Sequence, residues 1–281
     1  MVAETAQGGG VGKDSRDRRR ARGDVLAFVH GYNNDQKTVL ARHRRLKADL
    51  AAAGFRGEVM SFNWPSANMA FNYIEDRHDA RQTAMQPLTD GIRLVSEQQR
   101  PDCTINVHLL GHSTGAYVIR EAFGDAAYTR LLNPGWMVSQ IAFIGADVSS
   151  GSMSGDSARS SSLYRHCVRL TVCSNLYGSV LKFSNAKRAG LAPPVGRVAL
   201  PAKAPEKAVD VDCSDYYALL SQDAAVKSAD QTEAIGSFDH SSNVGNRVFA
   251  RDLFETLRGD LDRHIIPTRA LSNGRLKLAR A

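Results

Sequence analysis

One short segment constrains the fold of this chain more than any other feature: residues 111–115 are Gly-His-Ser-Thr-Gly. Residues 104–110 before it are apolar and β-branched, and residues 116–123 after it have the composition of a helix. A G-x-S-x-G segment between a strand and a helix is typical of a nucleophile elbow, where the tight turn leaves room only for glycines beside the serine. A glycine-rich turn with an idle serine is the alternative. The flanking strand and helix favour the elbow, so we predict that Ser113 is a nucleophile.

Strands and helices are expected to alternate along the rest of the chain. Short apolar runs predict buried parallel strands at residues 25–29, 58–62, 140–146, 169–173 and 209–212. Helical patterns lie between them, and the first helix is capped by Asp35 and closed by Gly54. This alternation predicts the α/β class: a mostly parallel, doubly wound sheet with helices on both faces.

A chain of 281 residues is long enough for one large domain, which we expect over residues 24–262. Within it, residues 148–163 are rich in serine and glycine and are predicted to form a surface loop or lid. Residues 214–238 are predicted to be a partly helical excursion.

The net charge of +7 comes from the two ends of the chain. Residues 1–23 carry six basic and three acidic side chains, and residues 263–281 carry five basic and no acidic ones. We expect a disordered basic N-terminal arm and a solvated basic C-terminal tail. Contact with nucleic acid or an acidic membrane is the alternative, but neither end interleaves the aromatics that stack on bases. No specific nucleic-acid partner is therefore expected.

We expect the chain to be cytoplasmic. It has no run of about 18 apolar residues that could form a transmembrane helix, and its first residues lack the apolar core of a secretory signal. Its four cysteines show neither C-x-x-C spacing nor a histidine-rich metal pattern, so reduced thiols and no metal site are expected. The sequence carries no signal of an oligomeric state.

A serine nucleophile needs a base, and three histidines follow Ser113. His166 opens a buried strand, and His264 lies in the basic end. His240 lies on a loop between the last predicted strand and the last helix. Because α/β sheets place their active sites in loops at the carboxyl ends of strands, we predict that His240 is the base. The alternative is a loop histidine that binds backbone.

The acid that would orient His240 is harder to assign. Hydrolases with a nucleophile elbow most often supply this acid from the loop that here begins at Ser174. Residues 171–205, however, contain no Asp or Glu. Asp147, which ends the strand after the elbow strand, is the preferred candidate. Its structural alternative is a cap. Asn175, Asp212 or no acid at all are the other candidates.

The remaining parts of a site would be an oxyanion hole and a substrate pocket. We predict that the backbone N–H groups of Tyr32 and Thr114 stabilise the oxyanion, with His30 holding the loop of Tyr32 in place. Phe71 and Tyr73 are predicted to line an apolar pocket for the acyl group, with simple core packing as the alternative.

Five motifs together resemble a known family. They are, in chain order, residues 28–34 (Phe-Val-His-Gly-Tyr-Asn-Asn), 61–66 (Ser-Phe-Asn-Trp-Pro-Ser), 108–115 (the elbow strand and turn), 146–148 (Ala-Asp-Val) and 239–241 (Asp-His-Ser). This set resembles the bacterial α/β-hydrolases of the domain-of-unknown-function 900 family, described as esterase/lipase-like, over about residues 24–260. The resemblance implies an α/β-hydrolase fold, a serine hydrolase with Ser113 and His240 in their motif positions, and no cofactor. The family commonly has an Asp where this chain has Gly178.

The expected function is that of an esterase/lipase-like serine hydrolase, which cleaves small-molecule carboxylic esters through an acyl-enzyme on Ser113. Two alternatives remain at this point. One is a thioesterase, amidase or acyltransferase that uses the same residues. The other is a catalytically silent hydrolase fold that serves as a binding module.

Overall fold

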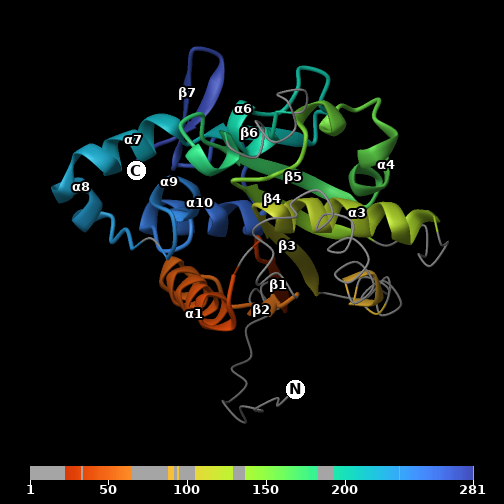
Figure 1. The fold of residues 1–281 in the computed structure, drawn as a ribbon, viewed down its shortest axis with the longest axis horizontal. Helices are drawn as coiled ribbons and strands as arrows, with labels where there is room; N and C mark the ends of the chain where they lie inside the picture. The colour runs from red at the N-terminus through yellow and green to blue at the C-terminus, as the bar shows by residue number, and fades with distance from the viewer. Residues whose placement is uncertain are drawn as a thin grey trace, which may run out of the picture.

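A single mixed sheet organises the chain. The computed structural model describes residues 23–32, 34–64, 88–91, 94, 105–128, 137–182, 193–233 and 235–280. Its eight strands are ordered β2-β1-β3-β4-β5-β6-β8-β7 (Figure 1). Their bounds are Asp24–Val29 (β1), Glu58–Phe62 (β2), Asn106–His112 (β3), Val138–Ile144 (β4), Cys167–Ser174 (β5), Ala208–Asp212 (β6), Arg269–Ser272 (β7) and Arg275–Leu278 (β8). All neighbouring strands pair in parallel except β7 and β8.

Helices cover both faces of the sheet. Their bounds are Gln36–Ala53 (α1), Thr114–Tyr128 (α3), Ala158–Arg165 (α4), Val195–Val198 (α6), Ser214–Gln222 (α7), Ala224–Ala229 (α8), Phe238–Ser241 (α9) and Arg247–Arg258 (α10), with a 3₁₀ turn, η2, at Ser150–Met153. One apolar cluster joins the sheet to α3 and α4, and a second joins it to α1, α7 and α10. The predicted doubly wound α/β fold is therefore confirmed. None of the helices in the described ranges is long and apolar enough to cross a membrane.

Helix α1 begins and ends where the sequence predicts. The Asp35 carboxylate accepts a hydrogen bond from Thr38 N at 2.7 Å, which satisfies one of the free N–H groups of the first turn. Gly54 takes the left-handed conformation, with φ of 109°, at the other end. A Cβ at Gly54 would lie 3.2 Å from Phe254 of α10, so the glycine also allows α1 and α10 to pack closely.

The serine-rich segment 148–163 differs from the prediction of a surface loop or lid. It forms η2 and most of α4, and Met153 and Leu163 are fully buried within it. Its serines are buried because backbone carbonyls accept their hydroxyl protons: Ser160 Oγ donates to Ser152 O at 2.7 Å, and Ser162 Oγ donates to Phe123 O at 2.6 Å. The predicted excursion at 214–238 contains α7 and α8, and α7 packs against the sheet through Tyr216 and Leu220.

The C-terminal segment also differs from the prediction of a solvated tail. Strands β7 and β8 form a hairpin, and β8 extends the sheet beside β6 (Figure 1). Leu276 and Leu278 are buried, since they alternate with the basic residues along β8. The basic residues are partnered by acids elsewhere in the chain, in the pairs Arg269–Asp252, Arg275–Asp212, Lys277–Asp215 and Arg280–Asp230. Residues 1–22 of the expected N-terminal arm lie outside the described residues.

Candidate active site

The elbow has the predicted strand–turn–helix geometry. Ser113 lies between β3 and α3 with φ of 55°, a left-handed value that is uncommon for a residue with a side chain. A Cβ at Gly115 would lie 2.1 Å from Val29 O, and one at Gly111 would lie 2.7 Å from the Cα of Ala116. Glycine is therefore required on both sides of the serine. Strain of this kind is held in place by the surrounding structure and is concentrated at functional sites.

Backbone hydrogen bonds fix the turn to the end of β4. Ser113 N donates to Ile144 O at 3.0 Å, and Ser113 O accepts from Asp147 N at 3.1 Å. Ser113 O also accepts from Ala116 N in the first turn of α3, at 3.2 Å. The predicted acid, Asp147, therefore lies in the segment bonded to the backbone of the predicted nucleophile. Its side chain is buried.

The loop after β1 crosses directly above Ser113. A Cβ at Gly31 would lie 2.7 Å from the Cβ of Ser113, so only glycine fits at this crossing. His30 holds the loop, as predicted: its Nδ1 donates to Gly31 O at 2.8 Å, and its carbonyl accepts from Trp64 Nε1 at 2.9 Å. Because a carbonyl can only accept, the Nδ1 atom carries the proton. Burial lowers the pKa of His30 and keeps this ring neutral.

His240 lies at the same end of the sheet as Ser113. It is buried on α9, and its ring packs against the chain just after β4, where a Cβ at Gly145 would lie 3.0 Å from His240 Nδ1. His112, the residue before the serine, donates from Nε2 to His240 O at 3.0 Å. The rings of His112 and His240 have their centroids 4.8 Å apart. The structure thus brings the elbow, Gly145 and His240 together, whereas His166 caps α4 and His264 is exposed beside Asp262.

Electrostatics keep His240 neutral. Burial is the main cause that lowers its pKa, to about 4. The negative charge of Asp239 acts in the opposite direction, and the positive charge of Arg42 on α1 lowers the pKa further. A neutral imidazole is the form that can accept a proton from a serine.

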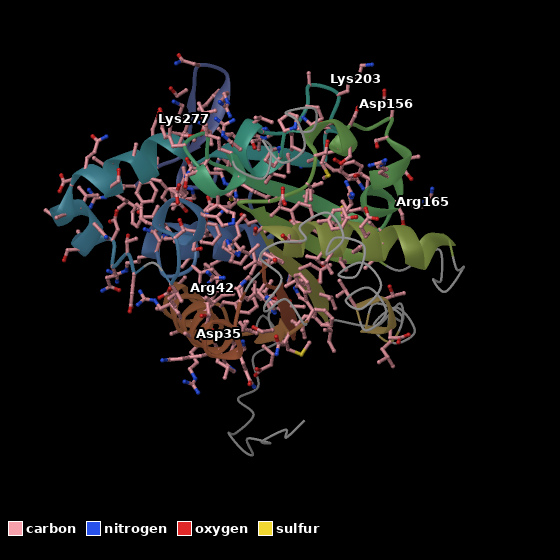
Figure 2. All side chains as sticks on the ribbon, in the orientation of Figure 1. Asp35, Arg42, Asp156, Arg165, Lys203 and Lys277 are labelled. Atoms are coloured by element: carbon pink, nitrogen blue, oxygen red, sulfur yellow. The ribbon has the colours of Figure 1, made fainter. Side chains whose placement is uncertain are left out.

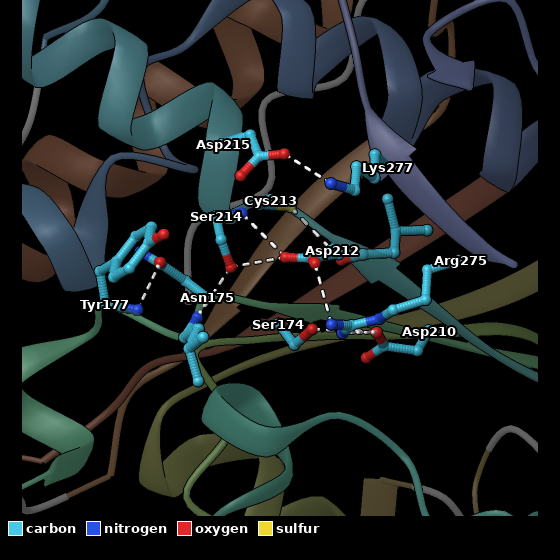
Figure 3. Close-up of polar contacts among 12 residues, drawn as sticks. Ser174, Asn175, Tyr177, Asp210, Asp212, Cys213, Ser214, Asp215, Arg275 and Lys277 are labelled. Carbon is cyan, nitrogen blue, oxygen red and sulfur yellow. Dashed lines mark hydrogen bonds and ion pairs between the residues drawn. The ribbon is translucent and has the colours of Figure 1, made fainter. Parts of the chain in front are cut away.

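The alternative acids lie in different surroundings. Asp212 is engaged elsewhere, since it accepts from Ser214 Oγ at 2.5 Å and pairs with Arg275 at 3.1 Å (Figure 3). Asn175 lies nearer to His240, because its Nδ2 donates to Asp239 O at 3.0 Å. Gly178 is also near this segment, as a Cβ there would lie 3.9 Å from Asp239 O. The loop after β5 therefore reaches the segment that carries His240, but it brings an amide and a glycine rather than a carboxylate.

A cavity of about 320 Å³ lies beside this loop. It is lined by Asn175, Tyr177, Tyr217, Ala218, Ser221, Gln222, Phe238 and Asp239. The predicted pocket residues Phe71 and Tyr73 lie outside the described residues. Within the described ranges, no group of His, Cys, Asp and Glu side chains is arranged to hold a metal ion.

Sequence reasoning missed two charged neighbours of His240. Asp239 precedes the histidine, and its carboxylate accepts from Ser179 N at 2.7 Å and from Ser237 Oγ at 2.5 Å. Arg42 lies on the buried stripe of α1, three residues after Val39 and four before Leu46. An arginine in the middle of an apolar helical stripe was the signal that could have identified it.

One family model and several solved structures match this chain. The family model for "Alpha/beta hydrolase of unknown function (DUF900)" matches residues 13–204. No curated protein matches the chain. The solved lipase-esterase related protein from Clostridium acetobutylicum is 9% identical, with 86% of this chain and 96% of that one covered and a TM-score of 0.40. A Bacillus licheniformis lipase is 12% identical, with 68% and 84% covered and a TM-score of 0.40.

Proposed function

Because the chain belongs to the DUF900 family of α/β hydrolases, we propose that it is a serine hydrolase that cleaves small-molecule carboxylic esters through an acyl-enzyme on Ser113. One observation carries the proposal. Ser113 is held at a left-handed φ beneath Gly31, at the strand end against which His240 packs. A serine, a neutral imidazole and a glycine loop that converge at one sheet edge are the parts that acyl transfer needs.

The reaction follows from these parts. His240 accepts the proton of the Ser113 hydroxyl while Oγ attacks the ester carbonyl, and the carbonyl oxygen becomes an oxyanion. When the tetrahedral intermediate collapses, the imidazolium gives its proton to the departing alkoxide, and an alcohol leaves. Water then attacks the acyl-enzyme while His240 takes a proton from it, and the imidazolium returns this proton to Ser113 Oγ as the carboxylic acid leaves.

Two backbone N–H groups are proposed to bind the oxyanion. Thr114 begins α3, where the first N–H groups have no partner within the helix. The second donor is Tyr32. The carbonyl of Gly31 is held by His30 Nδ1 and by Asn34 Nδ2, at 2.8 and 2.7 Å. In a trans peptide the N–H of the following residue points the opposite way, so the Tyr32 N–H points away from these two side chains.

Asp147 remains our proposed acid. Its support is position: it is buried, and its backbone bonds to the elbow two residues after Gly145, which touches His240. Within the described ranges, the carboxylate whose charge raises the pKa of His240 is Asp239. Ser179 N and Ser237 Oγ hold this carboxylate on its own side of the segment, so Asp147 stays our candidate to orient the ring.

A fluorophosphonate reagent tests the proposal, because it phosphonylates serines that are activated for acyl transfer. We expect the wild-type protein to be labelled and to hydrolyse nitrophenyl esters, and Ser113→Ala to do neither. Ser161→Ala, which changes an exposed serine of α4, is the control and should behave as wild type. Absence of labelling in folded wild-type protein would contradict the proposal and favour the silent binding fold. Esters, thioesters and amides of graded chain length then identify the substrate class.

A further inference from the structure

Helix α1 carries a buried arginine that takes no part in the steps above. Arg42 is 5% exposed and lies on the side of α1 that faces the His240 segment, residues 235–241 (Figure 2). Its hydrogen-bond partners in the described ranges are all neutral. Burial of a cation without a carboxylate is costly, and here it lowers the pKa of the guanidinium. A cost of this kind points to a role other than stability.

One side of the guanidinium holds both ends of the His240 segment. Nε and Nη2 donate to Ile235 O at 3.0 and 2.7 Å, and Nη2 also donates to Ser241 Oγ at 3.2 Å. Gly236 makes this approach possible, since a Cβ there would lie 2.6 Å from Nη2. The φ of Gly236 is 110°, which also favours glycine. Arg42 therefore fixes the segment just before and just after His240.

The other side of the guanidinium holds the oxyanion loop, by which we mean residues 31, 32 and 34. Nη1 donates to Asn34 Oδ1 at 2.8 Å, which fixes the orientation of this amide. The Nδ2 of Asn34 then donates to Gly31 O at 2.7 Å and to Tyr32 O at 3.0 Å. A continuous chain of hydrogen bonds thus runs from the peptide above Ser113, through Asn34 and Arg42, to the segment that carries His240.

The charge of Arg42 also acts on the histidines around the elbow. Burial is the main cause that lowers the pKa of His240, His112 and His30, and Arg42 lowers each of them further. In the part of the chain that the structure describes, the charged or titratable side chains that act on His240 or contact its ring are Asp239 on its own helix, Arg42 from α1 and His112 from β3. Asp147 would join them as the proposed acid. Asp239 is the one that opposes the effect of Arg42.

We propose that Arg42 is a positioning residue that holds the oxyanion loop and the His240 segment in a fixed relation, so that the Tyr32 N–H and the imidazole meet the same intermediate. The inference rests on the proposed function, in which Tyr32 and His240 act together. Arg42 itself does not touch the reacting atoms. Its loss should therefore slow turnover without weakening substrate binding.

The matched control is Arg45, one turn along the same helix. Arg45 also bonds to the C-terminal half of the chain, at Gln231 O, but it has the carboxylates of Asp49 and Glu233 as partners, and Gln231 and Glu233 both lie outside the His240 segment. We expect Arg42→Gln and Arg42→Lys to lower kcat for a nitrophenyl ester about 10- to 100-fold, with KM within about threefold. Arg45→Gln should stay within about twofold of wild type in both.

A second readout does not depend on turnover. In an NMR titration of the histidines, Arg42→Gln should raise the pKa of His240, whereas Arg42→Lys, which keeps the charge, should raise it less. An unchanged kcat and an unchanged pKa in Arg42→Gln would overturn the inference, and so would an equal loss of kcat in Arg45→Gln. If wild-type protein is not labelled by a fluorophosphonate, the proposed function fails, while the titration still tests the link between Arg42 and His240. If Arg42→Gln does not fold, Arg42→Lys is used for both the kinetics and the histidine titration.

Discussion

Two arginines in this molecule are almost equally buried but are held in opposite ways. Arg269, at the start of the C-terminal hairpin, makes a two-pronged contact with Asp252, at 2.8 and 2.7 Å. Burial disfavours its charge, but the charge and hydrogen bonds of Asp252 outweigh burial and raise its pKa. Arg42 has carbonyl, amide and hydroxyl partners instead, and its pKa is lowered.

This difference in partners implies different roles: Arg269 stabilises the fold, whereas Arg42 acts on the candidate active site. Where Asp252 neutralises Arg269, the ion pair ties the hairpin to α10. Where Arg42 is not neutralised, its charge acts on the imidazoles beside the elbow. Substitutions near Arg42 should therefore change rates, and substitutions near Arg269 should change the free energy of unfolding.

The largest effect is expected at the elbow side, from Asp147→Asn. If Asp147 orients His240, kcat should fall about 10³-fold or more, because the imidazole loses the group that fixes its tautomer. Steady-state kinetics with a nitrophenyl ester measure this loss, and thermal unfolding should show a Tm within a few degrees of wild type. Asp212→Asn is the control: it should keep its rate and lose only the contact with Arg275. Activity of Asp147→Asn within a few-fold of wild type would remove Asp147 from the mechanism.

The substitution Gly178→Asp also tests whether Asp147 orients His240. It places a carboxylate near Asp239 O, where the loop after β5 reaches the His240 segment. If Asp147 already orients the ring, kcat should change little. A tenfold rise in kcat would instead mean that the wild-type chain lacks an orienting acid.

On the hairpin side, Arg269→Met should lower the free energy of unfolding by about 3–5 kcal/mol, because it leaves the buried Asp252 carboxylate without its partner. Urea unfolding measures this change. The kcat of the folded protein should stay within about twofold of wild type. The double variant Arg269→Met/Asp252→Leu should regain much of the loss, since no charge is then left buried alone. A large loss of kcat in folded Arg269→Met would contradict the expectation that the hairpin affects stability but not activity.

The titration of His240 should change activity and stability over different pH ranges. Burial lowers the pKa of His240 to about 4, so kcat/KM should stay level from pH 7 to about pH 5 and fall only near pH 4. Stability should fall earlier. The unfolded histidine binds a proton near its ordinary pKa of 6.5 and the folded one does not, so unfolding is favoured as the pH drops from 6.5 towards 4. Each unit by which a pKa is lowered contributes about 1.4 kcal/mol. If kcat/KM instead fell near pH 6.5, the expectation that His240 stays neutral down to about pH 5 would be wrong.

The smallest effect is expected from Lys277→Gln, in the hairpin. Lys277 pairs with Asp215, whose side chain is largely exposed, so water screens the interaction. Thermal unfolding should show little or no loss of stability, with no change in rate. A loss as large as that of Arg269→Met would mean that exposure does not distinguish these pairs.

The sequence predicted what depends on local pattern. The elbow and the caps of α1 could be read from residues 111–115, Asp35 and Gly54, since each is determined by neighbours along the chain. His30 was correctly expected to hold the loop of Tyr32.

What could not be predicted depends on distant partners. Ser162 is buried because Phe123 O accepts its hydroxyl, and nothing near Ser162 in the sequence indicates that acceptor. In the hairpin, the basic residues of β8 obscured the alternation of Leu276 and Leu278, and their acidic partners lie 62 and 65 residues away. The acid of the site stays a prediction for the same reason, since its assignment depends on two side chains that are distant in the sequence, Asp147 after β4 and His240 on α9.

The position of β8 also bears on how the chain is made. Residues 275–278 occupy an interior place in the sheet, between β6 and β7, yet the ribosome adds them after the other strands that the structure describes. Until they emerge, the hydrogen-bonding edge of β6 stands open, and open edges are where nascent chains associate wrongly. Asp210 and Asp212, which later receive Arg275, place negative charge along that edge in the meantime. Asp210 and Asp212, which pair with Arg275 in the folded protein, thus also oppose aggregation at the edge of β6 before β8 has been synthesised.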